Sequence, residues 1–138
     1  MRYVACGIMY HNEKILMGKR SHDSDSPGIW EFPGGKLEKG ETIEECLHRE
    51  WKEELNLTIH IDRPVAVSTV EKDITCHFFI GKILDIINLQ QNVHESIGFF
   101  YPYEMKNLQL LQQTKRVLLK LSLLQKMARS MFLKIISI

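Results

Sequence analysis

Three glutamates, Glu50, Glu53 and Glu54, lie close together in one short stretch of the chain. At about 100° per residue, a helix over this stretch places all three on one side, with Glu54 nearly in line with the apolar row of Ile43 and Leu47. Neighbouring carboxylates repel one another, and removing them from water at the edge of a core is unfavourable unless they share a cation. Oxygen ligands of this kind suit Mg²⁺, with Mn²⁺ as a substitute. The spacing therefore predicts a helix that holds a divalent metal.

The alternative for any Glu-rich helix is a solvated amphipathic segment whose acids pair with Arg49 and Lys52. The spacing here is more restrictive, because the segment resembles the Nudix box. The matching residues are Gly35, Glu41, Arg49, Glu50, Glu53, Glu54 and Leu57. Two positions depart, since Trp51 replaces an aliphatic residue and Asn56 replaces a glycine. Asn tolerates the left-handed conformation, so we expect Asn56 to end the helix, and Trp51 enlarges what must pack beneath it.

The resemblance implies an enzyme that hydrolyses a diphosphate linked to another group. It places Glu50, Glu53 and Glu54 on the metal, with the Gly34 carbonyl as a further ligand because two consecutive glycines allow close backbone approach. Arg49 would orient Glu50 rather than touch substrate. The general base stays open between Glu50 and Glu95, an acid in the loop before the last predicted strand, and the alternative for Glu95 is an exposed loop residue beside a solvated His94.

Beyond the box, the chain is similar to the MutT-like nucleoside triphosphate pyrophosphohydrolases, above all over residues 30–38. That similarity implies that Arg20 contacts the phosphates or the base edge, that Phe32 forms part of the base pocket and that Lys36 contacts substrate. The structural alternatives are a solvated Arg20 and a core Phe32. Where those enzymes place an Asn or Asp that reads the base, this chain has Gln113, a donor and acceptor, and Thr114, a hydroxyl.

We therefore expect a Mg²⁺-dependent hydrolase of a nucleoside triphosphate that releases the monophosphate and pyrophosphate and so cleans the nucleotide pool. Oxidised guanine nucleotides such as 8-oxo-dGTP are the first candidate substrate, and cytosine nucleotides are the second. The alternatives are a Nudix hydrolase of another diphosphate, such as a nucleotide sugar or dinucleotide, and a catalytically silent nucleotide-binding module. Retention of the repelling carboxylates argues against the silent module.

Alternating apolar residues predict the elements that position these groups. They indicate a hairpin over residues 3–17, strands over 57–70, 74–84 and 97–101, and a loop over 18–28. Thr42 opens a capping box for a helix to about Leu55, and Pro102 opens a brief helix to Asn107. From Leu110 onward, Leu110, Val117, Leu121 and Leu124 recur on one helical side. Mixed strands and helices predict an α/β class, an α/β/α sandwich with a mixed sheet, which the Nudix resemblance also implies.

The length of 138 residues suits one domain, which we place at 1–126, followed by an amphipathic tail at 127–138. The net charge of +1 hides a basic end, because residues 105–138 contain seven Lys or Arg and no Asp or Glu. We expect a solvated helix face there, with the tail packed on its own domain or in a homodimer and with no nucleic acid or membrane partner. The tail carries Met127, Met131 and Ile135 at helical spacing beside Phe132 and Ile136.

The three cysteines are far apart in apolar contexts, so we expect reduced core residues in a cytoplasmic protein. The chain shows no signal-peptide pattern and no apolar run long enough to span a bilayer, so we expect neither.

Overall fold

The computed structural model describes residues 2–71 and 73–136. Its elements are β1 Arg2–His11, β2 Lys14–Lys19, β3 Trp30–Glu31, β4 Gly34–Lys36, α1 Ile43–Leu55, β5 Ile59–Glu71, β6 Ile74–Ile83, β7 Ser96–Phe100, the 3₁₀ helix η1 Pro102–Asn107 and α2 Gln112–Ile136. The strands form one sheet in the order β3-β2-β1-β6-β5, with β4 also paired to β1 and β7 to β2. Only the β1–β6 pairing is parallel among the described strands, so the sheet is mixed.

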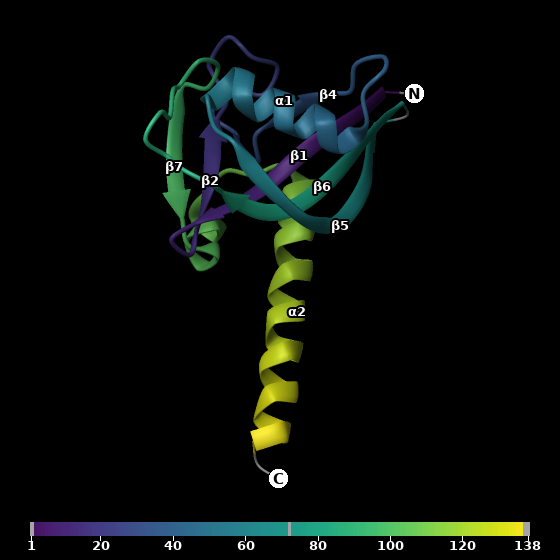
Figure 1. Cartoon of the computed structure of the whole chain (residues 1–138), viewed down its shortest axis with the longest axis vertical. Coiled ribbons are helices and arrows are strands. Elements are labelled where there is room, and N and C mark those ends of the chain that lie inside the picture. The colour runs from purple at the N-terminus through teal and green to yellow at the C-terminus, as the bar shows by residue number, and fades with distance from the viewer. Residues whose placement is uncertain (1, 72, 137–138) are drawn as a thin grey trace.

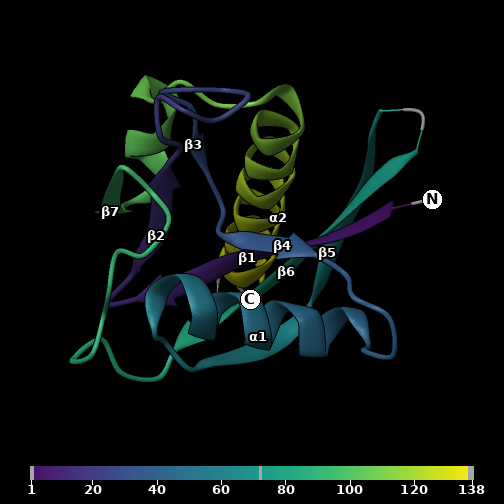
Figure 2. The same ribbon diagram turned by 90° about the horizontal axis from the view of Figure 1, so that it is seen from above.

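Helices cover both faces of this sheet, which confirms the predicted α/β/α sandwich. Alternation along β1 sends Ala5 and Met9 to the core beneath α1, and Ile8 to the core beneath α2. Figure 2 shows α1 and α2 on opposite sides of β1. The sheet therefore holds α1, with its carboxylates, along one face.

Helix α1 begins and ends where its local sequence predicts. The Thr42 hydroxyl accepts from the Glu45 backbone N–H at 3.1 Å, and the Glu45 carboxylate accepts from the Thr42 N–H at 3.0 Å. Asn56 ends the helix in the left-handed conformation, with φ of 55°. These caps fix the position of the glutamates along the helix axis.

The large side chain of Trp51 is accommodated by a glycine on the sheet. Its indole N–H donates to the Pro33 carbonyl at 2.8 Å, and the side chain is fully buried. A Cβ on Gly7 would lie 2.7 Å from the Trp51 Nε1 atom, so β1 has no side chain at the point where the indole lies. The Trp51–Pro33 hydrogen bond also ties α1 to the segment that leads into β4.

Two short strands, β3 and β4, were not predicted from the sequence. β3 and β4 have two and three residues, too few for an alternating pattern to register. They are nevertheless important for the site, because β4 pairs Gly34 with Cys6 and Gly35 with Ala5 on the central strand. The backbone before α1 is therefore held by the sheet.

Helix α2 differs from the expectation in its start and in its far half. Leu110 is buried before the helix begins, Val117 and Leu121 pack against the sheet, and Leu124 is exposed. The helix continues without a break through residues 126 and 127 and projects away from the domain (Figure 1). Met127 and Met131 are exposed, so the expectation that the tail packs on its own domain is wrong for these residues; the side chains of Phe132, Ile135 and Ile136 lie outside the described set.

In the described part of the chain, no helix combines the length and the apolar character that crossing a bilayer requires.

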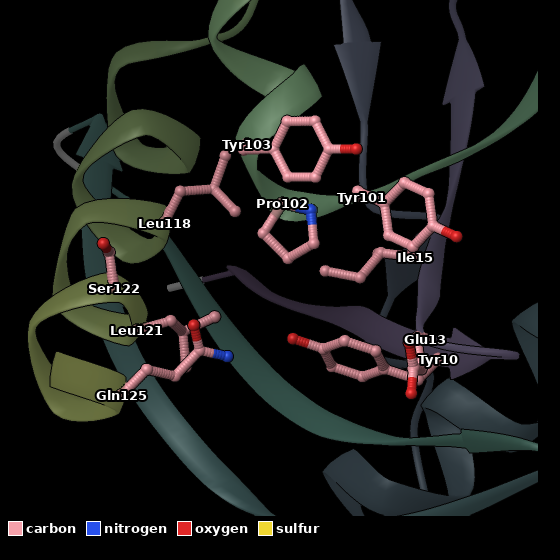
Figure 3. Close-up of a pocket in the computed structure, with 10 residues that line it drawn as sticks. All are labelled: Tyr10, Glu13, Ile15, Tyr101, Pro102, Tyr103, Leu118, Leu121, Ser122 and Gln125. Carbon is pink, nitrogen blue, oxygen red and sulfur yellow. The ribbon is translucent and has the colours of Figure 1, made fainter. Parts of the chain in front are cut away.

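A cavity of about 520 Å³ lies between α2, η1 and the β1–β2 hairpin. Figure 3 shows Leu118, Leu121 and Gln125 of α2 facing Tyr10 and Tyr101 across it. None of the residues that the sequence assigns to the site lines this cavity.

Candidate active site

Arg49 is the centre of a network that fixes the acids at the start of the site. Its guanidinium forms a two-pronged contact with Glu41, Nε to Oε2 at 3.0 Å and Nη2 to Oε1 at 2.7 Å. Nη1 contacts Glu50 at 2.9 Å and Glu53 at 3.2 Å, and Nη2 donates to the Lys36 carbonyl at 3.1 Å. The guanidinium lowers the pKa of Glu41 to about 2. Arg49 therefore joins the loop to the helix, and its contact with Glu50 is compatible with the predicted orienting role.

Glu50 lies directly against the backbone of Gly35. A Cβ on Gly35 would overlap the Glu50 carboxylate, so glycine is what lets this side chain lie against β4. Burial raises the pKa of Glu50, and the contact with Arg49 opposes that rise. The Glu53 carboxylate is exposed and turned toward Arg49.

The Glu54 carboxylate has a buried oxygen that lacks a counter-charge. Its Oε2 atom has no hydrogen-bond partner among the described residues. Burial, and then the carboxylates of neighbouring residues, raise its pKa to about 8; those neighbours are Glu50, Glu31 and Glu53. A buried oxygen ligand beside other carboxylates fits a divalent cation, because such an ion would supply the missing charge and the missing partner.

The described side chains do not form a complete metal cage by themselves. Among residues 2–71 and 73–136, no three Asp, Glu, His or Cys side chains are already gathered around one point as metal ligands. Mg²⁺ is commonly held by one or two carboxylates together with substrate phosphates and water, so a closed cage is not required. The donor set at Glu50 and Glu54 fits a cation that binds together with a phosphate ligand.

Replacing Gly35 by alanine tests how closely Glu50 must lie against β4. The added methyl overlaps the Glu50 carboxylate, so Gly35→Ala displaces this carboxylate and is expected to lower hydrolytic turnover by about 10- to 100-fold. Gly40→Asn is the control for loss of a glycine, because a Cβ there meets no atom within 4 Å and Asn is among the residues that most often adopt a positive φ, here 88°. Thermal unfolding of both variants separates backbone strain from the displacement of Glu50. Equal turnover of Gly35→Ala and the wild type would contradict a role for the Glu50 position.

Two adjoining hollows bring all five predicted substrate residues together. The first, of about 340 Å³, is lined by Glu54, Gly34, Lys36 and His94. The second, of about 310 Å³, is lined by Phe78, Gln113 and Thr114. Both hollows share the residues Val4, Cys6, Arg20, Glu31 and Phe32. A ligand can therefore extend from Glu54 of α1 to the start of α2, whereas Glu50 and Glu53 line neither hollow.

Phe32 contributes both to the core and to the hollows. It is buried, and its ring meets that of Phe78 edge to face, with 6.2 Å between the centroids. Thr114 is buried at the first turn of α2. The two residues place an apolar ring and a hydroxyl at the same end of the hollows.

A partly buried polar network lies where the two hollows meet, and no local pattern in the sequence indicates it. Glu31 accepts from Arg20 Nη1 at 3.1 Å, and its other oxygen lies 3.0 Å from His94 Nε2. His94 is buried rather than solvated, and it packs where a side chain at Gly18 would otherwise lie. The only available signal for Glu31 was its place before Phe32, because its partner His94 is 63 residues away.

Glu95 lies apart from the carboxylates of α1. Its side chain is 42% exposed, and one oxygen is 3.7 Å from Lys19 Nζ. It lines neither hollow, whereas its neighbour His94 lines the first. The structure therefore brings Arg20, Phe32, Lys36, Gln113 and Thr114 to the hollows and does not bring Glu95 there.

Comparison with known proteins identifies a matching family model and several similar proteins. A family model described as the NUDIX domain matches residues 1–121. A CTP pyrophosphohydrolase of Escherichia coli is 40% identical over 63 residues, which are 46% of this chain and 47% of that protein. An 8-oxo-dGTP diphosphatase of Proteus vulgaris is 38% identical over 85 residues, 56% of this chain and 73% of that protein. The match thus spans about half the length of the first relative.

Solved structures share the fold over most of the chain. The solution structure of the E. coli ORF135 protein has a TM-score of 0.75 and 28% identity, and the match covers 91% of each chain. A MutT protein from Methanosarcina mazei has a TM-score of 0.78 at 18% identity, with 90% of this chain and 94% of that chain covered. The second likeness bears on the fold alone.

Proposed function

This chain belongs to the NUDIX domain family of hydrolases, and on that premise we propose that it hydrolyses a nucleoside triphosphate to the monophosphate and pyrophosphate. The observation that carries the proposal is the buried Oε2 atom of Glu54, which has no hydrogen-bond partner among residues 2–71 and 73–136 and belongs to a residue that lines a hollow continuing to Phe32 and Thr114. A cation at Glu54 and an apolar, hydrogen-bonding end beyond it fit the two halves of a nucleotide. Family membership supports the reaction class.

Each charged group has a role in this reaction. Glu50, Glu53, Glu54 and the Gly34 carbonyl would hold the divalent ion. Mg²⁺, or Mn²⁺ in its place, would offset the phosphate charge and make the attacked phosphorus more electrophilic. Arg49 orients Glu50 and does not need to contact the substrate. Arg20 and Lys36 attract the phosphate chain, because both line the hollow beside Glu54.

The proton acceptor for the attacking water is Glu50 or Glu95. Glu50 is the candidate that we favour, since burial raises its pKa and its carboxylate lies against Gly35, which lines the first hollow. Both carboxylates are paired with a basic residue, Glu50 with Arg49 and Glu95 with Lys19, and neither lines a hollow itself, so either one serves only after its side chain moves.

The second hollow is the proposed base pocket. Phe32 and Phe78 provide apolar contact, and Gln113 and Thr114 offer hydrogen-bond donors and acceptors. We propose an oxidised guanine nucleotide such as 8-oxo-dGTP as the substrate, which gives the protein a role in cleaning the nucleotide pool. The Proteus relative, an 8-oxo-dGTP diphosphatase, supports this choice. The E. coli relative, a CTP pyrophosphohydrolase, makes cytosine nucleotides the second candidate.

A pyrophosphate-release screen tests the proposed function. The panel contains the normal nucleoside triphosphates, 8-oxo-dGTP, a nucleotide sugar and a dinucleotide, each with Mg²⁺ and with a chelator. We expect Mg²⁺-dependent pyrophosphate release, with kcat/KM for 8-oxo-dGTP at least about tenfold above that for dGTP, because a hydrogen bond to the altered base edge discriminates at this level or above. Thr114→Val should reduce this preference without loss of turnover on the other nucleotides.

The other results of the screen separate the competing functions. A preference for CTP would replace the guanine assignment and keep the reaction. Turnover of the nucleotide sugar or dinucleotide alone would contradict a triphosphate substrate. Nucleotide binding without hydrolysis of any compound in the panel would indicate a binding module.

A further inference from the structure

The far half of α2 presents an apolar stripe that the domain does not cover. The stripe consists of Leu123, Leu124, Met127 and Met131, with exposures of 54%, 44%, 61% and 62%. It lies on the part of the helix that projects beyond the sheet (Figure 1). An exposed group of large apolar side chains of this kind indicates an interaction surface.

The stripe is only partly a continuation of the side of α2 that packs on the domain. At about 100° per residue, Leu123, Met127 and Met131 fall within about 80° of one another. The centre of this group lies roughly a quarter turn around the helix from the buried Val117 and Leu121, whereas Leu124 lies on the same side as these two residues. Extending the same packing along the helix would therefore cover Leu124 but leave Leu123 and Met127 uncovered.

The charge of α2 narrows the choice of partner. The helix carries six basic residues and no Asp or Glu, the basic residues being Lys115, Arg116, Lys120, Lys126, Arg129 and Lys134. Arg116 and Lys120 form a shallow surface together with Leu123, Leu124 and Met127, so positive charge adjoins the stripe itself. A partner must therefore accept apolar side chains and positive charge at once.

A second copy of the chain could cover the apolar side chains but would not offset the positive charge. A twofold interface places the same patch against itself, so Arg116 and Lys120 of each copy would approach like charges, with no acid on α2 to offset them. A nucleic acid would attract the charges but gives Met127 and Met131 no apolar environment. An anionic bilayer offers both, because apolar side chains enter the acyl boundary while basic side chains extend to the headgroups.

We propose that the stripe of α2 docks the domain on an anionic phospholipid surface, with the helix in the plane of the interface. The stripe spans eight residue steps from Leu123 to Met131, about 12 Å of helix, which allows two turns of contact. Lys126 lies about 60° around the helix from Leu123, at the flank of the stripe, where its side chain reaches the headgroup layer, and Arg129 lies on the far side of the helix. The docking surface is separate from Glu54 and the hollows, so it does not depend on the proposed substrate.

Flotation of the full chain with vesicles tests this proposal. The vesicles are phosphatidylcholine alone, or phosphatidylcholine with about one third phosphatidylglycerol, at low and at physiological salt. We expect at least about tenfold more protein on the anionic vesicles, with weaker binding as salt rises. The double variant Met127→Gln/Met131→Gln should lower this binding about tenfold or more, because it removes the apolar contact and keeps the charge.

Further variants serve as controls for this experiment. Ser122→Gln places a glutamine about 100° around the helix from Leu123, outside the stripe, and should bind like the wild type. Lys126→Gln/Arg129→Gln should weaken binding to the anionic vesicles only. All variants should keep wild-type helical circular dichroism and thermal midpoint, which shows that they fold.

Several results would overturn the proposal. One is no flotation of the wild type at low salt, and another is equal flotation with both kinds of vesicle. A wild-type dimer in sedimentation that Met127→Gln/Met131→Gln dissociates, without vesicle binding, would assign the stripe to a second copy. Binding of a short DNA duplex that only Lys126→Gln/Arg129→Gln abolishes, again without vesicle binding, would assign the helix to nucleic acid.

Discussion

Replacing Glu54 by glutamine is expected to lower hydrolytic turnover by at least about 10³-fold, because a lost metal ligand removes several kcal/mol of charge stabilisation in the transition state. The same change is expected to raise the thermal midpoint of the metal-free protein. Glutamine keeps the shape of the side chain and removes a buried acid whose ionisation in the folded state is opposed by burial and by three neighbouring carboxylates. A variant that is more stable and inactive distinguishes a functional acid from a structural one.

The pH dependence of this stabilisation follows from the raised pKa of Glu54. The folded value is about 8 and the ordinary value is 4.5, so the unfolded chain releases this proton first as the pH rises. The contribution of the protonated Glu54 to stability is therefore complete below about pH 4.5 and is lost progressively as the pH rises through 8. Thermal midpoints measured with a chelator between pH 5 and 8 should fall more steeply for the wild type than for Glu54→Gln, on the order of several degrees across the range.

Glu44→Gln is the matched control for Glu54→Gln. It makes the same chemical change on α1, at an exposed position in the first turn and outside both hollows. It should leave turnover and the pH slope unchanged. Addition of Mg²⁺ should raise the midpoint of the wild type and of Glu44→Gln but not of Glu54→Gln, since binding to the folded state alone adds stability. Near-normal turnover of Glu54→Gln at saturating Mg²⁺ would refute the metal assignment.

Replacing Arg49 by alanine is expected to lower turnover by about 10²-fold and the free energy of unfolding by about 1 to 2 kcal/mol. Alanine leaves Glu41 and Glu50 without their shared cation and releases the Lys36 carbonyl. The expected loss of unfolding free energy is smaller than that for breaking a buried ion pair, because the Arg49 side chain is 22% exposed. Turnover and denaturant unfolding measure the two effects.

Arg49→Lys separates charge from geometry at the same position. Lysine keeps the positive charge but has a single donor group, so it cannot contact both oxygens of Glu41 while it also holds Glu50. We expect it to restore part of the stability and little of the turnover. Lys52→Ala, an exposed change on the same helix, should affect neither quantity. Full turnover of Arg49→Lys would show that charge alone suffices.

The sequence by itself determined α1 and the acids on it. The Thr42–Glu45 capping box and the end of the helix at Asn56 depend on contacts between residues at most five positions apart. The spacing of Glu50, Glu53 and Glu54 then follows from the helical period alone. Apolar patterning along the longer strands likewise predicted where they lie, because six or more residues are enough for the pattern to register. The parallel pairing of β1 with β6, which makes the sheet mixed, is a tertiary contact.

The tertiary structure alone decided which distant residues meet. Glu31 and His94 are 63 positions apart, and Gly7 accommodates Trp51 from another element, so no local pattern in the chain predicts these contacts. β3 and β4 are too short to show alternation, and they form because β2 and β1 offer backbone partners. The same holds for the exposed stripe of α2: helical spacing predicts that Met127 and Met131 share a side, but the edge of the sheet decides that the domain ends before it reaches them.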